Sequence, residues 1–284
     1  MGKLFCTANN LKTKKVIRIL DSEVKNTLLV KIAISALAII LSIVFLLICV
    51  YIIIPSIISN ASDSIDKNYA RQMYESTLKE PAAADDAEPV FVQPGELKPR
   101  SIFAAALAEN PDVAGRIRLD GVGIAYLVLQ TDDNEYYLKT GYSGKESRLG
   151  AVFLDYRCNP ALRPLKGHYI IYGHNIESGA IFHNLLKYKD KDTFYDNRII
   201  NFDTLYEDYR WEIFSAYTTT TDFYYIDTVF KDGQDWLDFL HEIQQKSMFP
   251  TDAALSADDV ILTLSTCTNE SDSERFVIHA RLIK

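Results

Sequence analysis

The sequence predicts a mainly β domain, an antiparallel barrel or sandwich, that follows one N-terminal transmembrane helix. Two observations lead to this expectation. An uncharged run of 27 residues, from Ile32 to Ile58, precedes most of the chain. From Gly115 onward, short strand-like runs alternate with turns, and only two or three segments have the pattern of helices. Many short strands with few helices are typical of barrels and sandwiches.

Charge is distributed unevenly along the chain. The 284 residues carry a net charge of −8 with a mean hydropathy of −0.04. Residues 1–31 hold seven basic and two acidic residues, a net +5, so the other 253 residues carry −13. The ordinary composition excludes a wholly disordered, collagen-like or disulfide-dense chain. The net negative charge argues against a general nucleic-acid binder.

The uncharged run has the length of a membrane anchor. A helix rises 1.5 Å per residue, so about 20 residues cross a hydrocarbon core of about 30 Å. The apolar core of a cleaved signal has only about 7–15 residues. The length therefore favours an anchor, although Ser59-Asn60-Ala61 would suit a cleavage site. Because the basic flank precedes the run, the positive-inside rule predicts that residues 1–31 are cytoplasmic and the rest is extracellular.

A helix is expected after the anchor. Residues 62–80 carry a sparse apolar stripe of Ile65, Tyr69 and Met73 at helical spacing. Pro81 follows this segment and cannot continue the helix. The segment therefore predicts a juxtamembrane helix that ends before Pro81.

A linker and a second short helix come next. Residues 81–99 are rich in Pro, Ala, Asp and Glu, as linkers are. Ser101 suits the N-cap of a helix through Glu109, which Asn110-Pro111 would end. We therefore expect four parts: a basic cytoplasmic tail (1–31), a transmembrane anchor (32–58), a juxtamembrane helix with linker (59–100) and an extracellular domain (101–284).

The extracellular domain contains seven strand candidates and two clear helix candidates. The strand candidates share β-prone or alternating apolar runs bounded by turn residues. They are 116–119, 125–129, 151–154, 169–172, 211–217, 260–264 and 276–283. The helix candidates are 181–188 and 236–245.

A cysteine and an arginine are expected to meet at one end of the sheet. The β-prone run that starts at Val260 ends at Cys267, and eight residues later Arg275 opens the next strand. Adjacent antiparallel strands would bring both residues to the same end. An electropositive neighbour favours the thiolate form of a cysteine, and an arginine offers N–H donors to a developing oxyanion.

One histidine has a position suited to acid–base chemistry. His174 follows the apolar run 169–172, where a strand ends and a loop begins. Rigid scaffolds commonly present catalytic groups at such points, and histidine is the usual proton donor or acceptor. The other histidines are interpreted as structural or surface residues: His279 in the sheet on the face of Arg275, His241 on a helix surface, and His168 and His183 without special surroundings.

The cysteine count leaves the role of the thiols open. On the predicted topology Cys6 is cytoplasmic, Cys49 lies in the membrane, and only Cys158 and Cys267 are extracellular. Two exported cysteines do not make a disulfide scaffold. Either these two pair with each other, or one of them is a working thiol.

Several motifs resemble one enzyme family. Thr263-Leu264-Ser265-Thr266-Cys267 followed by Arg275 resembles the active-site signature of the sortases, membrane-anchored cysteine transpeptidases of Gram-positive bacteria. The resemblance is closest to class B and covers roughly residues 100–284. The further motifs, in family order, are Asn110-Pro111-Asp112, 133–138, 150–155, 171–175 and 275–280.

The resemblance implies a fold and a reaction. The fold is a closed eight-stranded sortase-type β-barrel with N-terminal helices and one long helix between late strands, which candidate 236–245 fits. In the implied reaction, Cys267 attacks a backbone carbonyl in a sorting motif of a secreted protein and forms a thioacyl enzyme, which an amine then resolves. His174 would protonate the leaving amine and deprotonate the incoming one. Arg275 would hold the substrate and stabilise the oxyanion.

The resemblance also implies partners. By their positions in the motifs, Asn134, Leu138, Tyr172 and Ser265 would line the groove for the sorting signal. The partners would be secreted proteins with a C-terminal sorting signal, NPxTx-like or [SP]PxTG-like, and an amine of a peptidoglycan precursor or cross-bridge. One helix would contact the membrane. No cofactor, metal or nucleic acid is expected.

Other functions stay open at this point. A pilin-polymerising sortase would use a Lys amine on another protein. An unrelated secreted cysteine hydrolase is disfavoured because His174 precedes Cys267, the reverse of the papain-like order. An inactive binding module would lack a catalytic group, yet all three are present. Cys158 departs from the family pattern and is interpreted as a buried bystander, with a regulatory pairing to Cys267 as the alternative.

Overall fold

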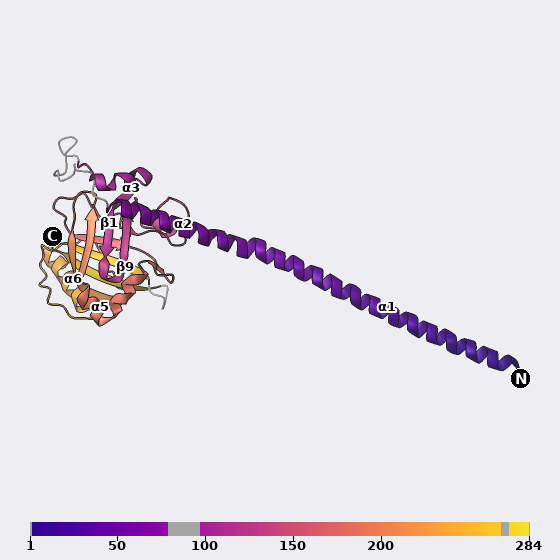
Figure 1. Ribbon diagram of the computed structural model, residues 1–284. Coiled ribbons are helices and arrows are strands. Elements are labelled where there is room, and N and C mark those ends of the chain that lie inside the picture. The colour runs from indigo at the N-terminus through magenta and orange to yellow at the C-terminus, as the bar shows by residue number, and fades with distance from the viewer. Residues whose placement is uncertain (1, 79–96, 268–272, 284) are drawn as a thin grey trace. The chain divides into compact units, whose positions relative to one another are not determined.

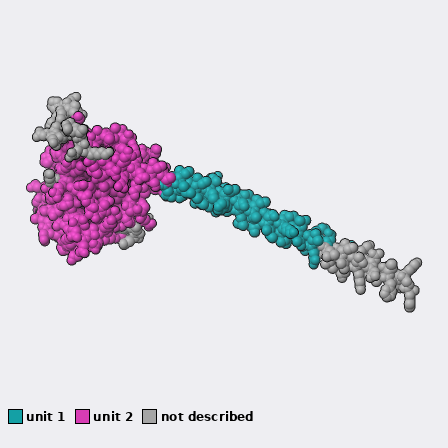
Figure 2. Space-filling model, viewed as in Figure 1, with its two compact units in different colours: residues 1–60 teal, residues 61–284 magenta. Residues whose placement is uncertain are grey.

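The computed structural model describes residues 2–78, 97–267 and 273–283. It contains two compact units, residues 1–60 and residues 61–284 (Figure 2). Most of the predicted linker, residues 79–96, lies outside the described residues.

The first unit is helical. Helix α1 (Gly2–Ile48) continues through a π-helical turn (Cys49–Ile53) into helix α2 (Ile54–Ser76), which ends in the second unit (Figure 1). Within the described residues, one helical stretch, Glu23–Ser76, is long and apolar enough to cross a membrane. Its apolar side chains between residues 32 and 58 are almost all exposed, as side chains that face lipid are. The helix therefore fits a single-pass anchor.

The second unit contains a closed eight-stranded barrel, which confirms the expected fold. Its strand order is β1-β2-β3-β4-β9-β10-β8-β7. Strands β2 and β3, and β4 and β9, pair in parallel, and the other neighbours are antiparallel. The barrel strands are β1 (Val113–Leu119), β2 (Ile124–Leu129), β3 (Phe153–Leu154), β4 (His168–Tyr172), β7 (Ile199–Thr204), β8 (Arg210–Thr220), β9 (Ile261–Cys267) and β10 (Glu274–Leu282).

Alternation along the strands separates the two faces of the barrel wall. In β9, Leu262 and Leu264 point into the main core, whereas Ile261 belongs to a cluster on the outer face. In β10, Phe276 and Ile278 likewise point into the core. This period of two leaves Thr263 and Ser265 on the outer face of β9.

Helix α6 (Gly233–Gln245) covers that outer face (Figure 1). In the sequence it lies between β8 and β9, as expected for the long late helix. The carboxylate of Asp232 caps its start and accepts from the backbone N–H groups of Gln234 and Asp235, both at 3.0 Å. Trp236, Leu240 and Ile243 bury the apolar face of the helix against the sheet.

The remaining elements are short. They are a 3₁₀ turn (Ser101–Phe103) leading into α3 (Ala104–Glu109), the 3₁₀ turns Asp120–Val122 and His183–Lys189, α4 (Tyr136–Lys139), α5 (Lys191–Asp196), and a two-stranded hairpin of β5 (Asn175–Ile176) and β6 (Ala180–Ile181).

The structure departs from the local expectations in three places. Strand β7 is not among the predicted strands; in the structure its Asp203 pairs with Arg116 of β1 across the strands at 2.9 Å. The segment 181–188 forms the end of β6 and a 3₁₀ turn instead of an α-helix. Ile65 is 69% exposed, because the packed face of α2 carries polar Asp63 in its place.

Candidate active site

Three strand ends bring the predicted catalytic positions together. The register pairs Cys267 of β9 with Arg275 of β10. On its other side, β9 pairs in parallel with β4, where Tyr172 lies opposite Ser265. The backbone N–H of Gly173 extends this ladder and donates to the carbonyl of Ser265 at 3.2 Å. His174 therefore leaves the sheet at the same end of the barrel as Cys267 and Arg275.

The orientation of the His174 ring follows from one hydrogen bond. Its Nε2 lies 2.8 Å from the backbone carbonyl oxygen of Leu138. Because a carbonyl only accepts, Nε2 must carry the proton. In the neutral ring, Nδ1 then holds the lone pair and is the atom that can accept or return a proton.

Gly150 makes this arrangement possible. Its φ of +59° favours glycine. A Cβ at this position would lie 3.0 Å from Cδ2 of His174 and 2.5 Å from the carbonyl oxygen of Tyr137. Because Gly150 has no side chain, its backbone can lie against both the His174 ring and the backbone of Tyr137 and Leu138.

A groove of about 400 Å³ lies beside His174 and Arg275. The four residues predicted to bind substrate, Asn134, Leu138, Tyr172 and Ser265, all line it. The remaining lining residues are Phe153, Gly173, Thr221, Phe223, Tyr224, Tyr225, Ile226 and Thr266. For Cys267, the structure describes the backbone pairing in β9.

A buried carboxylate organises one wall of the groove. Asp155 is fully buried, and its Oδ2 accepts from Nδ2 of Asn134 and from the hydroxyl of Tyr172, both at 2.9 Å. Oδ1 of Asn134 accepts from the N–H of Tyr156 at 3.1 Å, which fixes the amide orientation. Burial raises the pKa of Asp155, but hydrogen bonds from Arg157 and Tyr172 outweigh burial, so the pKa is lowered.

Arg157 connects this carboxylate to a second segment of the groove lining. It donates to Asp155 from Nε at 2.8 Å and from Nη2 at 2.7 Å. The same guanidinium donates to the hydroxyl of Tyr224 at 3.3 Å and to the carbonyl of Ile226 at 3.0 Å. The pair of Asp155 and Arg157 therefore supports four residues that line the groove.

The loop between β8 and α6 supplies residues that sequence reasoning missed. Tyr224, Tyr225 and Ile226 line the groove, and the hydroxyl of Tyr225 lies 2.8 Å from Oγ of Ser265. The signal in the sequence is the aromatic run Phe223-Tyr224-Tyr225 in a segment with no strand or helix pattern. Asp155 ends the motif 150–155, and the sequence around it gives no sign of its contacts in the groove.

Two histidines form a buried chain behind the groove, which corrects the interpretation of His168. Nδ1 of His168 lies 2.7 Å from the carbonyl of Asp227 and Nε2 lies 2.6 Å from Oγ1 of Thr263. That hydroxyl is 2.7 Å from Nδ1 of His279, whose Nε2 is 2.8 Å from the hydroxyl of Tyr217. Since the carbonyl only accepts, Nδ1 of His168 donates to Asp227. With both rings neutral, Thr263 then donates to His168, His279 to Thr263, and Tyr217 to His279.

This direction requires both rings to be neutral. Burial lowers the pKa of His168 to about 4. Burial, and then the neighbouring His168, lower the pKa of His279 well below its ordinary value. His279 is structural, as interpreted from the sequence. His241 is exposed, and Nδ1 of His183 contacts Oδ1 of Asn175 at 2.7 Å.

Cys158 is buried outside the groove. Its thiol donates to the carbonyl of His168 at 3.4 Å, and burial raises its pKa to about 12. Only a small fraction of such a thiol ionises near neutral pH, so it is a poor nucleophile.

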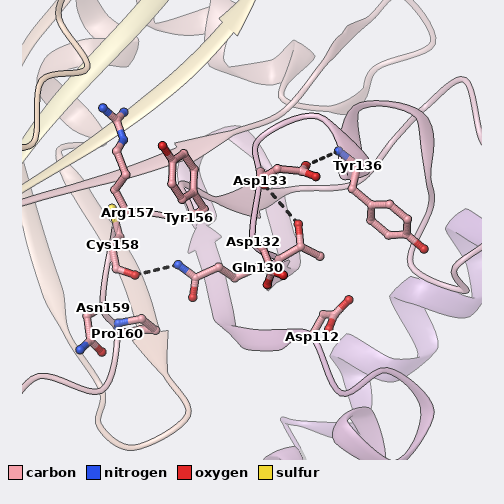
Figure 3. Close-up of a pocket in the computed structure, with 11 residues that line it drawn as sticks. Asp112, Gln130, Asp132, Asp133, Tyr136, Tyr156, Arg157, Cys158, Asn159 and Pro160 are labelled. Carbon is pink, nitrogen blue, oxygen red and sulfur yellow. Dashed lines mark hydrogen bonds between the residues drawn. The ribbon is translucent and has the colours of Figure 1, made fainter.

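A second cavity, of about 670 Å³, has Arg157 in its lining (Figure 3). Asp112, Asp132 and Asp133 line it together with Arg157 and Cys158. Within this lining, Nε2 of Gln130 donates to the carbonyl of Cys158 at 2.7 Å (Figure 3). Among the described residues, no group of His, Cys, Asp and Glu has the geometry of a metal site. The groove is the stronger candidate for chemistry because His174 and Arg275 line it.

Comparisons with known proteins identify the family of the chain. A family profile described as the Sortase domain matches residues 117–283. Sortase B of Listeria monocytogenes is 39% identical over 176 residues, 61% of this chain and 71% of that protein. Sortase B of Staphylococcus aureus is 36% identical over 177 residues, 62% of this chain and 72% of that protein.

Solved structures give the same result. Sortase B of Bacillus anthracis in complex with AAEK2 has a TM-score of 0.68 at 37% identity, and covers 78% of this chain and 97% of its own. The S. aureus sortase B–substrate complex has a TM-score of 0.68 at 30% identity, and covers 79% of this chain and 99% of its own.

Proposed function

The chain belongs to the sortase family and is a sortase B-type cysteine transpeptidase, an enzyme class that anchors proteins to the cell wall; we propose that Cys267, His174 and Arg275 carry out its reaction. The observation that supports this proposal is the meeting of β4, β9 and β10. Cys267 and Arg275 are register partners of β9 and β10, His174 follows β4 on the other side of β9, and both His174 and Arg275 line the groove.

The first half of the reaction forms a thioester. The thiolate of Cys267 attacks a backbone carbonyl carbon of the bound peptide, and the carbonyl oxygen becomes an oxyanion beside Arg275. Nδ1 of His174, protonated at this stage, gives its proton to the departing amine. The C–N bond breaks and the acyl group stays on sulfur.

The second half returns the enzyme to its starting state. An amine attacks the thioester carbonyl, and Nδ1 of His174 accepts the proton that the amine loses. The C–S bond breaks, a new amide forms, and the thiolate of Cys267 leaves. The hydrogen bond from Nε2 to Leu138 can persist through both halves, because the proton moves at Nδ1.

The groove supports a peptide substrate. It combines aromatic side chains from three segments with a few polar groups, as ligand sites do. The S. aureus relative has been solved as a substrate complex. We assign Asn134, Leu138, Tyr172 and Ser265 to the recognition of a sorting signal, with an amine of peptidoglycan as acceptor.

The N-terminal helix supports a tethered enzyme. Its apolar segment 32–58 would span the bilayer, with the basic residues 1–31 in the cytoplasm and the domain 101–284 outside. The helix and linker of residues 59–100 would connect the two. The tether would hold the thiol at the surface where secreted proteins emerge.

A peptide-library assay tests this proposal. Full-length protein in detergent is incubated with NPxTx-like and [SP]PxTG-like peptides, with and without an amine acceptor. We expect cleavage within one motif class, transfer to the amine, and loss of both in Cys267→Ala. Cys158→Ala is the matched control and should retain activity. Cleavage by Cys267→Ala would contradict the proposal.

A further inference from the structure

Helix α2 binds the loop whose last residue, Gly150, lies against the candidate catalytic histidine. Asp63 and Asp66, one helical turn apart, point toward the loop formed by residues 141–150. Residues at this spacing share a helix face. All of these residues belong to the second compact unit.

Asp63 binds the C-terminal half of this loop. Its side chain is buried, and its Oδ1 accepts from Oγ of Ser147 at 2.9 Å and from the N–H of Arg148 at 3.2 Å. Its Oδ2 pairs with the guanidinium of Arg148 at 3.2 Å. A buried carboxylate with this many donors fixes the backbone that it binds.

Asp66 binds the N-terminal half. Its two oxygens accept from the N–H groups of Tyr142 at 3.0 Å and Ser143 at 2.9 Å. The backbone of Gly141 lies so close to this carboxylate that a Cβ there would collide with it. The loop therefore begins with a glycine that admits Asp66.

The loop ends with the glycine that contacts His174. The N–H of Gly150 donates to the carbonyl of Ser147 at 3.3 Å, so the residue held by Asp63 holds Gly150 in turn. The N–H of Ser147 donates to the carbonyl of Lys139 at 2.8 Å, next to Leu138. Ser147 is thus bonded directly to Gly150, on one side of His174, and to Lys139, the neighbour of Leu138, on the other.

We propose that Asp63 and Asp66 are positioning residues for His174. By fixing the loop 141–150 on α2, they keep Gly150 against the imidazole and the Leu138 carbonyl on Nε2. This inference rests on the proposed role of His174 in the reaction. A displacement of about 1 Å in a catalytic group can cost about a hundredfold in rate, so a small shift of the loop is enough.

The test compares Asp63→Asn, Asp66→Asn and Gly141→Ala with Glu75→Gln in the full-length protein. Glu75 lies on the same helix in an exposed pair with Arg71 and does not contact the loop, so it is the matched control. Two readouts are used: kcat and KM for the peptide that the wild type cleaves, and the pH dependence of Cys267 alkylation by iodoacetamide, measured by peptide mass spectrometry. Neither readout responds to a loss of stability that leaves the site intact.

We expect the three loop-directed variants to lower kcat by about ten- to hundredfold with little change in KM. Their alkylation midpoint should move toward that of His174→Ala and of a free thiol, near pH 8.5. The Glu75→Gln variant should match the wild type. Gly141→Ala keeps both carboxylates, so agreement with the Asn variants assigns the effect to the contact rather than to the charge.

Three results would overturn the inference. In the first, all three loop-directed variants keep the wild-type kcat and the wild-type alkylation midpoint at temperatures where they are folded. Another is an equal effect in Glu75→Gln. The third is an alkylation profile that His174→Ala leaves unchanged, since there would be no pairing to position. If the wild type cleaved no peptide at all, the proposed function would be refuted. The alkylation profiles would still test whether Asp63 and Asp66 position His174.

Discussion

The imidazole of His174 donates from Nε2 to the backbone carbonyl of Leu138 over 2.8 Å. This contact joins a residue at the end of β4 to a residue of α4 that also lines the groove. It directs Nδ1 to proton transfer and makes the acid–base chemistry depend on the backbone around Leu138 and Gly150. The predictions below test this support, the walls of the groove and the buried chain behind it.

Gly150→Ala should inactivate the enzyme more than it destabilises it. The new Cβ would collide with the Tyr137 carbonyl and press on the His174 ring, so we expect kcat to fall by about a hundredfold or more. Gly167→Ala is the control, because Gly167 also has a positive φ, +76°, but nothing lies within 4 Å of a Cβ there. This variant therefore has the backbone strain of about 1–2 kcal/mol without any collision. Equal kcat values in the two variants, measured by peptide cleavage, would refute the role of Gly150.

Asp155→Asn should damage the groove. The change removes the charge that Arg157 pairs with and disturbs the contacts to Asn134 and Tyr172. Breaking a buried ion pair costs roughly 3–5 kcal/mol, and we expect a raised KM for the peptide at any temperature where the variant is folded. Chemical unfolding and steady-state kinetics measure both effects. Asp120→Asn, in an exposed pair with Arg118, should change stability by less than about 0.5 kcal/mol; an unchanged KM in Asp155→Asn would contradict the prediction.

Stability of the barrel should fall as the pH drops from 7.5 to 5. The pKa of His168 is lowered to about 4 in the folded state, against about 6.5 unfolded. The unfolded chain therefore binds a proton that the folded chain does not, and stability is lost as the pH falls below about 6.5. The loss at pH 5 is about 2 kcal/mol for His168, and His279 adds to it in the same direction.

Chemical unfolding followed by near-UV circular dichroism at both pH values measures this loss. Asp155, whose pKa is lowered, contributes in a different window, because its stabilisation is lost only as the pH falls below about 3.9. The exposed His241 offers a control, since His241→Gln should leave the pH dependence unchanged. A flat stability profile between pH 7.5 and 5 would show that the two rings are not held neutral.

Cys158 should resist alkylation in the folded protein. Burial raises the pKa of its thiol to about 12, so at pH 8 the thiolate fraction is on the order of one in ten thousand. We expect iodoacetamide to modify Cys267 within minutes and Cys158 only after denaturation, as read by mass spectrometry of the two peptides. Rapid modification of Cys158 in the native protein would mean that this thiol is accessible and ionised.

The sequence is most informative where contacts are local. Cys267 and Arg275 are eight residues apart on adjacent strands, so a hairpin pattern is enough to predict that they lie at one end of the sheet, and the register pairs them. Helix α6 is similarly foreseen over residues 236–245, because a helical pattern is a property of one segment; the structure adds the start at Gly233, where Asp232 caps the helix. His174 is identified by its place at the end of β4.

Long-range polar contacts could not be predicted in this way. Asp155 receives bonds from residues 21 and 17 positions away, and Tyr225 meets Ser265 across 40 positions. No periodicity encodes such pairs. The same reason explains the exposed Ile65 of α2. Tyr69 and Met73 of the predicted stripe pack against the core, but near Ile65 the helix contacts the domain through Asp63 and Asp66, which bind a loop more than 70 residues later.

The most direct test of Cys267 as the nucleophile is to trap its acyl intermediate. Full-length enzyme is mixed with the cleaved peptide without an amine acceptor, quenched in acid and digested for mass spectrometry. We predict that the acyl fragment of the sorting peptide is attached to Cys267 through a hydroxylamine-sensitive bond, and that His174→Ala greatly slows its formation. An acyl group on any other residue, or cleavage with Cys267 unmodified and replaceable by Ala, would contradict this mechanism.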